Sequence, residues 1–255
     1  WPGRQDCAHG LAQLDRSRTA LMSLRTVMAD LKRAGTAQNR KIYARHGARE
    51  PMFGVSYGDL NTFAKTYRGQ HELGLELFAS GNHDARQLAA KIVDPRLVTD
   101  ELADEWVHAV DCYITAEAVA GVVSNAPVAR SRSDAWRDRP SEWIASAGWA
   151  VLAFSADDES AWSTSDLQLL LEQIEAEIHD RPNRVRHEMN MAVITIGLRS
   201  PGLRRNAIAT AKRIGPVVVD HGETNCKTPD AVGYIQKAVA HRAAKAARHA
   251  ANTQR

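Results

Sequence analysis

Apolar residues recur at three- and four-residue spacing along most of the chain, which is the period of an amphipathic helix. The clearest case is residues 18–33, where the apolar positions are Leu21, Leu24, Val27, Met28 and Leu31. The alternation that is typical of a half-buried strand is nearly absent, and the one strand candidate is the short run 217–219. The pattern therefore predicts an all-α protein.

Capping and helix-breaking residues divide this pattern into about a dozen helices of ordinary length. The predicted helical ranges are 18–33, 56–67, 71–80, 83–93, 99–110, 111–121, 140–154, 167–178, 182–198 and 200–214, with a last long helix that opens at 228–230. Ser56, Thr99 and the pair Ser165-Asp166 are the expected N-terminal caps. We expect loops in the polar stretch 34–54 and in the arginine-rich connection before Pro140.

Short turns between successive helices favour antiparallel helix pairs stacked in a HEAT-like α-solenoid, whose units are about 40–47 residues long. A helix bundle is the competing architecture. We expect an N-terminal extension over 1–17, a single repeat domain over 18–240, and a basic helix end or tail over 241–255.

The composition is that of an ordinary globular protein, with 44% apolar and 25% charged residues in a chain of 255. Apolar runs such as 149–154 are too short to span a membrane, and no leader pattern opens the chain. Because the chain begins at Trp1 rather than Met, a missing leader stays open. The three cysteines include no CxxC pair, which fits a reducing cytoplasm.

The net charge is only +3, but the basic residues are unevenly distributed. Basic groups occur at Arg130, Arg132, Arg137 and Arg139, and at Arg199, Arg204, Arg205, Lys212 and Arg213. No acidic residue follows Asp230, whereas lysines and arginines continue to the end of the chain. Such patches are compatible with contacts to a phosphate backbone, although a solvated helix face is the preferred interpretation of the C-terminal tail.

Tyr113 and Glu117 are four residues apart, so a helix places them on one face. An aromatic ring beside a carboxylate suits a site that stabilises a cationic sugar or base. The alternative is a half-buried tyrosine with a solvated glutamate. Trp136, between Arg132 and Arg137, is the tryptophan that we expect to touch a ligand, whereas most of the others should belong to the core.

Other candidate chemistry is weaker. Asp220, His221, Glu223 and Cys226 have metal-ligand side chains but no zinc spacing, so a structural loop is preferred and no metal is expected. The pair His187-Glu188 lacks the later histidine of a zinc-protease helix and is expected at the surface. No Gly-rich phosphate loop or GxSxG motif occurs, which excludes nucleotide hydrolysis and serine esterase chemistry.

Several segments, in this order along the chain, resemble the DNA alkylation repair family of HEAT-like-repeat DNA glycosylases. The segments are Phe53–Ser56 with 76–89, then Asp111–Gly121, then Trp143–Trp149. The later run 219–231 (VDHGETNCKTPDA) resembles a signature of a bacterial branch of the family, to which we assign no chemistry.

The resemblance implies a HEAT-like α-solenoid with a concave basic surface that holds duplex DNA by its backbone. Active members hydrolyse the N-glycosidic bond of cationic 3- or 7-alkylated purines without a cofactor, and are thought to do so without full base flipping. The family's catalytic aspartate falls on Glu117 and its nearby aromatic residue on Tyr113, with Asp111, Trp143 and Trp149 around them. Ser146 and Val193 stand where the family has a DNA-contacting arginine and a sugar-packing tryptophan.

Three functional hypotheses follow. The preferred one is a monomeric, cytoplasmic and nucleoid-associated glycosylase in which Glu117 assists C–N cleavage and Tyr113 packs on the sugar. The residues expected to contact DNA are Arg130, Arg132, Trp136, Arg137, Arg204 and Arg205. The first alternative, favoured by Ser146 and Val193, is a non-catalytic protein that binds branched or damaged DNA. The second alternative is a protein-binding helical scaffold.

Overall fold

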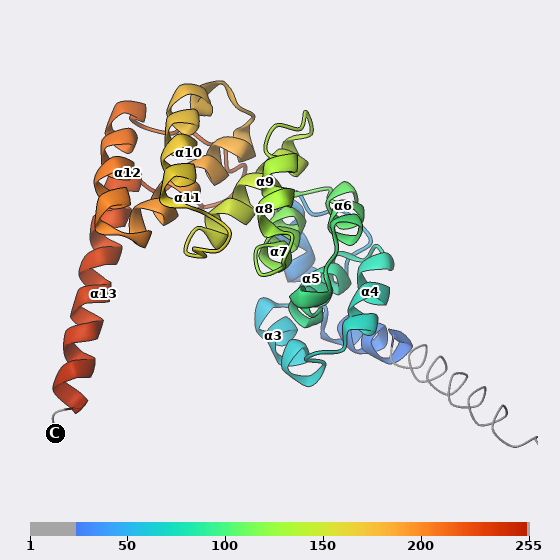
Figure 1. The fold of residues 1–255 in the computed structure, drawn as a ribbon. Coiled ribbons are helices and arrows are strands. Elements are labelled where there is room, and N and C mark those ends of the chain that lie inside the picture. Colours follow the sequence, from blue (N-terminus) through green and yellow to red (C-terminus); the bar gives the residue numbers. More distant parts are fainter. Residues whose placement is uncertain (1–23, 254–255) are drawn as a thin grey trace, which may run out of the picture. The chain divides into compact units, whose positions relative to one another are not determined.

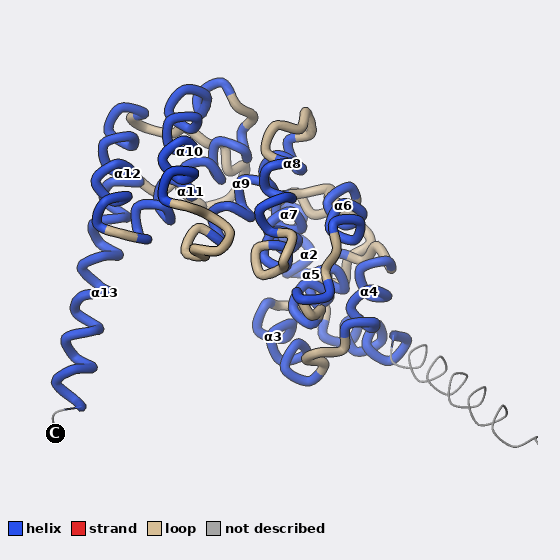
Figure 2. Tube along the Cα trace, viewed as in Figure 1, coloured by secondary structure: helices blue, strands red, loops and turns tan. Residues whose placement is uncertain are grey.

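The computed structural model describes residues 24–253, with side-chain burial up to residue 248. Helices joined by turns make up this part of the chain, which contains no strand (Figures 1 and 2). The all-α prediction is therefore confirmed. The predicted extension 1–17, the first part of the helix 18–33 and Arg255 lie outside the described residues. None of the described helices is long and apolar enough to cross a membrane.

The contacts divide the chain after Asp94 into two compact units, and each is described by itself. The single repeat domain expected over 18–240 stays a prediction. In unit 1, residues 24–34 are helical and are followed by α2 (Ala37–Arg45), α3 (Tyr57–Thr66), α4 (His71–Ala79) and α5 (His83–Ile92). Ser56 caps α3 as predicted, its side chain accepting from the Asp59 N–H at 3.1 Å.

The loop predicted over 34–54 is wrong, because α2 lies within it. Thr36 caps this helix and accepts a hydrogen bond from the Asn39 N–H at 3.1 Å. Tyr43 is its one buried side chain, and the Tyr43 hydroxyl donates to the Val55 carbonyl. A helix anchored by one aromatic residue has no repeating apolar face, so the periodicity could not indicate it.

Unit 2 contains the short 3-10 helix η1 (Pro95–Leu97) and then eight α-helices and a second 3-10 helix. These are α6 (Asp100–His108), α7 (Tyr113–Val123), α8 (Ala129–Trp136), α9 (Glu142–Ser155), α10 (Thr164–Glu177), η2 (Ile178–Asp180), α11 (Asn183–Arg199), α12 (Pro201–Ile214) and α13 (Ala231–Thr253). Helix α9 packs against α7, α8 and α11, and α11 also packs against α12 and α13. The core of this unit therefore lies around α9 and α11.

Two glycines allow close packing in this core. A Cβ at Gly148 would lie 2.6 Å from the Arg137 backbone nitrogen, so α9 approaches the end of α8 through a position without a side chain. A Cβ at Gly197 would lie 2.7 Å from Ile235 Cδ1, at the contact between α11 and α13. Such approaches are possible only for glycine.

Three local predictions in unit 2 are corrected. The arginine-rich connection is helix α8, anchored by the buried Ala129, Ser133 and Trp136. Residues 217–219 are not a strand, since no neighbouring strand is present among the described residues to complete a ladder. The cap of α10 is Ser163 rather than Ser165, with Asp166 completing a capping box.

Candidate functional site

Tyr113 and Glu117 lie one turn apart at the start of α7, and both contact Arg184 of α11. Arg184 Nη2 is 3.1 Å from Glu117 Oε1, and Arg184 Cζ lies 3.8 Å from the centroid of the Tyr113 ring. The Arg184 side chain is only 8% exposed, whereas that of Glu117 is 41% exposed. The predicted aromatic–carboxylate pair therefore surrounds a buried guanidinium that belongs to the protein itself.

A second carboxylate stands beside the same cation. Glu188 Oε1 lies 3.9 Å from Arg184 Nη2, and the Glu188 side chain is 5% exposed. Burial, reinforced by the charge of Glu117 and opposed by Arg184, raises the pKa of Glu188 to about 8. Burial also raises the pKa of Glu117, against the lowering effect of Arg184. Burial therefore favours the protonated form of both carboxyl groups, and the positive charge of Arg184 opposes this effect at each of them.

The surface position predicted for His187-Glu188 is wrong for Glu188. This residue is one turn after Arg184 on the buried side of α11, so it follows Arg184 into the core. His187 is partly buried, and burial together with Arg184 and His221 lowers its pKa to about 4. His187 is consequently neutral at physiological pH.

The segment 220–230 lies along α11 beside this cluster. Asn183 exchanges two hydrogen bonds of 2.7 Å with the Asp220 backbone, and Asn190 Nδ2 donates to the Pro229 carbonyl at 3.0 Å. The His187 and His221 rings meet edge to face at 5.6 Å. These contacts support the structural interpretation of the segment. Within residues 24–253, no group of three or more His, Cys, Asp or Glu side chains is arranged to hold a metal ion.

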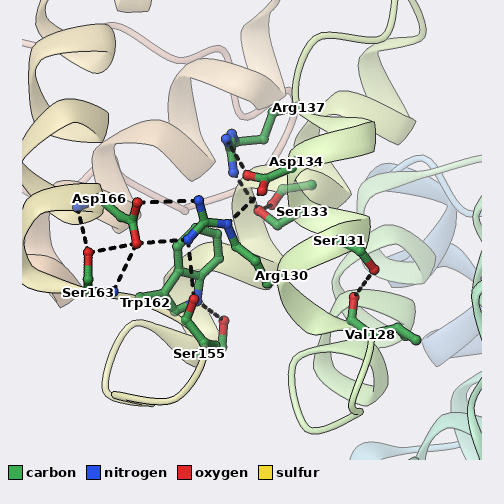
Figure 3. Close-up of polar contacts among 12 residues, drawn as sticks. Val128, Arg130, Ser131, Ser133, Asp134, Arg137, Ser155, Trp162, Ser163 and Asp166 are labelled. Atoms are coloured by element: carbon green, nitrogen blue, oxygen red, sulfur yellow. Dashed lines mark hydrogen bonds and ion pairs between the residues drawn. The ribbon is translucent and has the colours of Figure 1, made fainter.

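The arginines of α8 that were expected to contact DNA are engaged in ion pairs within the protein. Arg130 contacts Asp134 at 2.6 Å and Asp166 at 3.0 Å, and its guanidinium lies 4.5 Å from the Trp162 ring centroid (Figure 3). This contact with Arg130 lowers the pKa of Asp166 well below its ordinary value. The network therefore ties α8 to the start of α10.

The other two arginines of this group are similarly paired. Arg132 contacts Asp100 at 2.7 Å and Asp104 at 2.6 Å, which joins α8 to α6. Arg137, whose side chain is 10% exposed, contacts Asp134 at 2.7 Å. Their predicted role at phosphates stays a prediction, and it would require each guanidinium to exchange a carboxylate for a phosphate.

Trp136 is buried, at 2% exposed, and its indole N–H donates to Asp104 Oδ1 at 2.7 Å. In this position its ring has no surface to offer to a ligand. Trp149 is fully buried, as expected of a core residue, while Asp111 and Trp143 are partly buried. On α12, Arg205 is exposed and Arg204 partly buried.

Ser146 and Val193, the two positions at which the sequence is expected to depart from the family's DNA contacts, both lie in unit 2. Ser146 is buried, and its hydroxyl donates to the Trp143 carbonyl at 3.0 Å. Val193 is buried in the core beside α13. Neither side chain reaches the surface.

Arg184 and Glu188 are the members of the cluster that sequence reasoning missed. Their four-residue spacing was a usable signal for an ion pair within one helix. This spacing could not indicate that Arg184 also pairs with Glu117, which is 67 residues away from it in sequence.

Comparison with known proteins identifies the family of this chain. A family model described as DNA alkylation repair enzyme matches residues 27–235. The uncharacterized protein Lin0241 of Listeria innocua is 31% identical over 205 residues, which are 78% of this chain and 89% of that protein. The uncharacterized protein Lmo0209 of Listeria monocytogenes is 29% identical over the same shares of the two chains.

A solved structure gives the fold comparison. It is described as a new family of proteins related to the HEAT-like repeat DNA glycosylases with affinity for branched DNA structures. It is 31% identical to this chain, with a TM-score of 0.78, and the match covers 86% of this chain and 94% of that one. The chain thus belongs to the DNA alkylation repair family and has a HEAT-like-repeat helical fold.

Proposed function

We propose that this protein binds branched DNA and does not excise bases. The observation that carries the proposal is the position of Arg184, whose guanidinium lies against the Tyr113 ring and pairs with Glu117. Tyr113 and Glu117, the two groups that would stabilise a cationic transition state, are already in contact with the Arg184 cation.

The electrostatics oppose glycosylase chemistry at this place. Hydrolysis of an alkylated purine develops positive charge on the sugar, which a nearby carboxylate stabilises. Here the charge of Glu117 is balanced by Arg184 at 3.1 Å. A second positive charge about 4 Å from Arg184 would be repelled by about 4 kcal/mol at an effective dielectric constant of about 20. The Tyr113 face that would pack on a sugar is covered by the guanidinium at 3.8 Å.

Two further observations support binding without excision. Ser146 and Val193, in place of the family's DNA-contacting arginine and sugar-packing tryptophan, are both buried. The 31%-identical solved protein is described as having affinity for branched DNA structures. Its match covers most of both chains, so the same kind of substrate is a reasonable first choice for this protein.

A base-excision function is the second candidate, and the 41% exposure of the Glu117 side chain favours it. In that case the carboxylate reaches the solvent side of the cluster and faces the DNA there. Arg184 would then have to leave the Tyr113 ring when a substrate binds. Such a movement exposes a buried cation and breaks its contacts with two carboxyl groups, so the substrate itself would have to replace these contacts.

The test combines binding and chemistry on the same preparation. Binding to a four-way DNA junction and to a linear duplex of equal length is measured at several salt concentrations. Release of 3- and 7-methylpurine from methylated duplex is measured with the wild type, Glu117→Gln and Arg184→Gln. We expect tighter binding to the junction and no base release from the wild type or either variant.

The alternatives give different results. Base release by the wild type that is lost in Glu117→Gln would establish the glycosylase function and overturn the proposal. Base release that appears only in Arg184→Gln would mean that Arg184 suppresses an otherwise competent site. Failure to bind either DNA, even at low salt, would favour the protein-binding scaffold, because phosphate contacts strengthen as salt falls.

A further inference from the structure

We propose that the exposed face of α13 from Lys237 to Arg248 is a second DNA-contacting surface, which binds the phosphate backbone through Lys237, Lys245 and Arg248. This inference rests on the proposed DNA-binding function and adds to it a second contact surface, which lies on helix α13. It concerns residues outside the Tyr113–Glu117–Arg184 cluster.

The helix has two different halves. Its first turns are anchored in unit 2, with Ala231 and Ile235 buried and Ile235 in contact with α11 at Gly197. Arg242 Nη1 donates to the Leu198 carbonyl at 3.1 Å, which ties the helix to the end of α11. Every residue from 240 to 248 is exposed, and Figure 1 shows α13 continuing beyond α11 and α12. The second half is therefore a helix surrounded by solvent.

The cations from Lys237 to Arg248 share one face. Lys237, His241, Lys245 and Arg248 follow one another at spacings of four, four and three residues, which keeps them within one side of a helix. All four are exposed. No acidic residue follows Asp230 in the sequence, so no acidic side chain of this helix offsets their charge. The result is a basic stripe along the helix axis, defined here as Lys237, Lys245 and Arg248 with His241 between them.

The composition of the helix identifies the chemistry of the partner. Beyond Val239 the chain has no large apolar residue, and alanines occupy most positions between the basic ones. A helix that binds a membrane surface needs a bulky apolar face, and a helix that docks in a protein groove needs apolar anchors. Beyond Val239 the helix offers positive charge without either, and the exposed Tyr234 lies before this part. A polyanion that needs no apolar contact, such as the DNA backbone, is the partner that fits.

Stabilisation of cations by the helix dipole explains only part of the basic stripe. Cations in the last turn of a helix are stabilised by the helix dipole, but this effect is confined to that turn. Lys237 lies in the second turn of a helix that extends from Ala231 to Thr253. Alanine-rich sequence also favours a helix without tertiary contacts, which allows this half to present the stripe in solution.

The experiment compares two triple variants of the full chain. Lys237→Gln, Lys245→Gln and Arg248→Gln together neutralise the stripe and keep good helix formers. The control is Lys32→Gln, Lys41→Gln and Lys65→Gln, which removes the same charge from exposed positions of unit 1. Affinity for a four-way junction is measured from low to moderate salt, and helical content by circular dichroism. Vesicles with anionic lipid are tested as a second polyanionic surface.

For the stripe variant we expect unchanged helical content, affinity for the junction reduced by about tenfold or more, and a shallower salt dependence. The slope of log K against log salt should fall by about 0.9 for each phosphate contact that is lost. The control should change less in both respects. An unchanged slope in the stripe variant, or an equal loss in both triples, overturns the inference while leaving the DNA-binding function in place.

The remaining outcomes are also decisive. If the wild type binds neither junction nor duplex at any salt, the proposed function fails and the stripe proposal fails with it. If the wild type binds vesicles through the stripe, and the stripe variant keeps full DNA affinity, the partner of this helix is a lipid surface and the inference is wrong.

Discussion

The guanidinium carbon of Arg184 lies 3.8 Å from the centroid of the Tyr113 ring, so a cation of α11 covers the aromatic face of α7. The same guanidinium is 3.1 Å from Glu117 and 3.9 Å from Glu188. One buried positive charge thus holds together an aromatic ring and two carboxylates. The stability of unit 2 and the chemistry available at Glu117 consequently depend on the same residue.

Replacing Arg184 by Gln should destabilise the protein. The substitution leaves Glu117 without its partner and removes a packed guanidinium from the Tyr113 ring. Because Glu117 is 41% exposed, the cost should be about 2 kcal/mol, below the roughly 3–5 kcal/mol for breaking a fully buried pair. Urea unfolding of the two proteins at pH 7 measures the difference. Arg205→Gln, at an exposed position of α12, is the control and should change stability by less than about 0.5 kcal/mol. Equal effects of the two substitutions would show that the Arg184 contacts contribute little.

Glu188 should make the protein less stable as the pH rises. Its pKa is about 8 in the folded protein and near 4.5 when unfolded, so the folded state holds the proton more tightly. The stabilisation is present in full below pH 4.5 and is lost as the pH rises through 8. Glu188→Gln, which mimics the protonated acid, should therefore gain stability over the wild type with increasing pH, by more than about 1 kcal/mol between pH 5 and pH 8.

Urea unfolding of the wild type and Glu188→Gln across this range is the measurement. The matched control is Glu223→Gln, which alters an exposed side chain in the segment beside the cluster. Its stability relative to the wild type is the reference for the same substitution at an exposed position. A difference for Glu188→Gln that does not change with pH would mean that Glu188 is ionised in the folded protein throughout.

Gly197→Ala and Gly202→Ala should have opposite effects, although both add one methyl group to a helix. A Cβ at Gly197 would lie 2.7 Å from Ile235 Cδ1 and 3.0 Å from Ala207 Cβ, so α11 and α13 must move apart. Overpacking of this kind costs about 1–3 kcal/mol. At Gly202 nothing lies within 4 Å, so alanine should be neutral or stabilise α12 by up to about 1 kcal/mol.

Thermal unfolding of the two alanine variants distinguishes these outcomes. The midpoint should fall for Gly197→Ala and stay or rise for Gly202→Ala. A stable Gly197→Ala variant would mean that α13 moves away from α11 at little cost. In that case the anchoring of the exposed half of α13 by Ile235 would be weaker than its burial indicates.

Local sequence determined the helices wherever a repeating apolar face and a cap occurred together. Ser56 and Thr99 cap α3 and α6 as predicted, because an N-cap acts within three residues of itself. The same reasoning missed α2, whose buried face consists of Tyr43 alone. It also left 217–219 as a strand candidate, because β-branched residues occur there, but no neighbouring strand is present among the described residues.

The candidate site was likewise predictable from the sequence only in part. The pairing of Tyr113 with Glu117 follows from their spacing on one helix, and the family resemblance rests on short segments whose order the sequence shows directly. The sequence did not indicate that Arg184 would lie between them, that Glu188 would be buried, or that α8 would pair its arginines with carboxylates of α6 and α10. These features depend on contacts between helices that are distant in sequence, and the electrostatics of a side chain are set by its burial and neighbours in the folded protein.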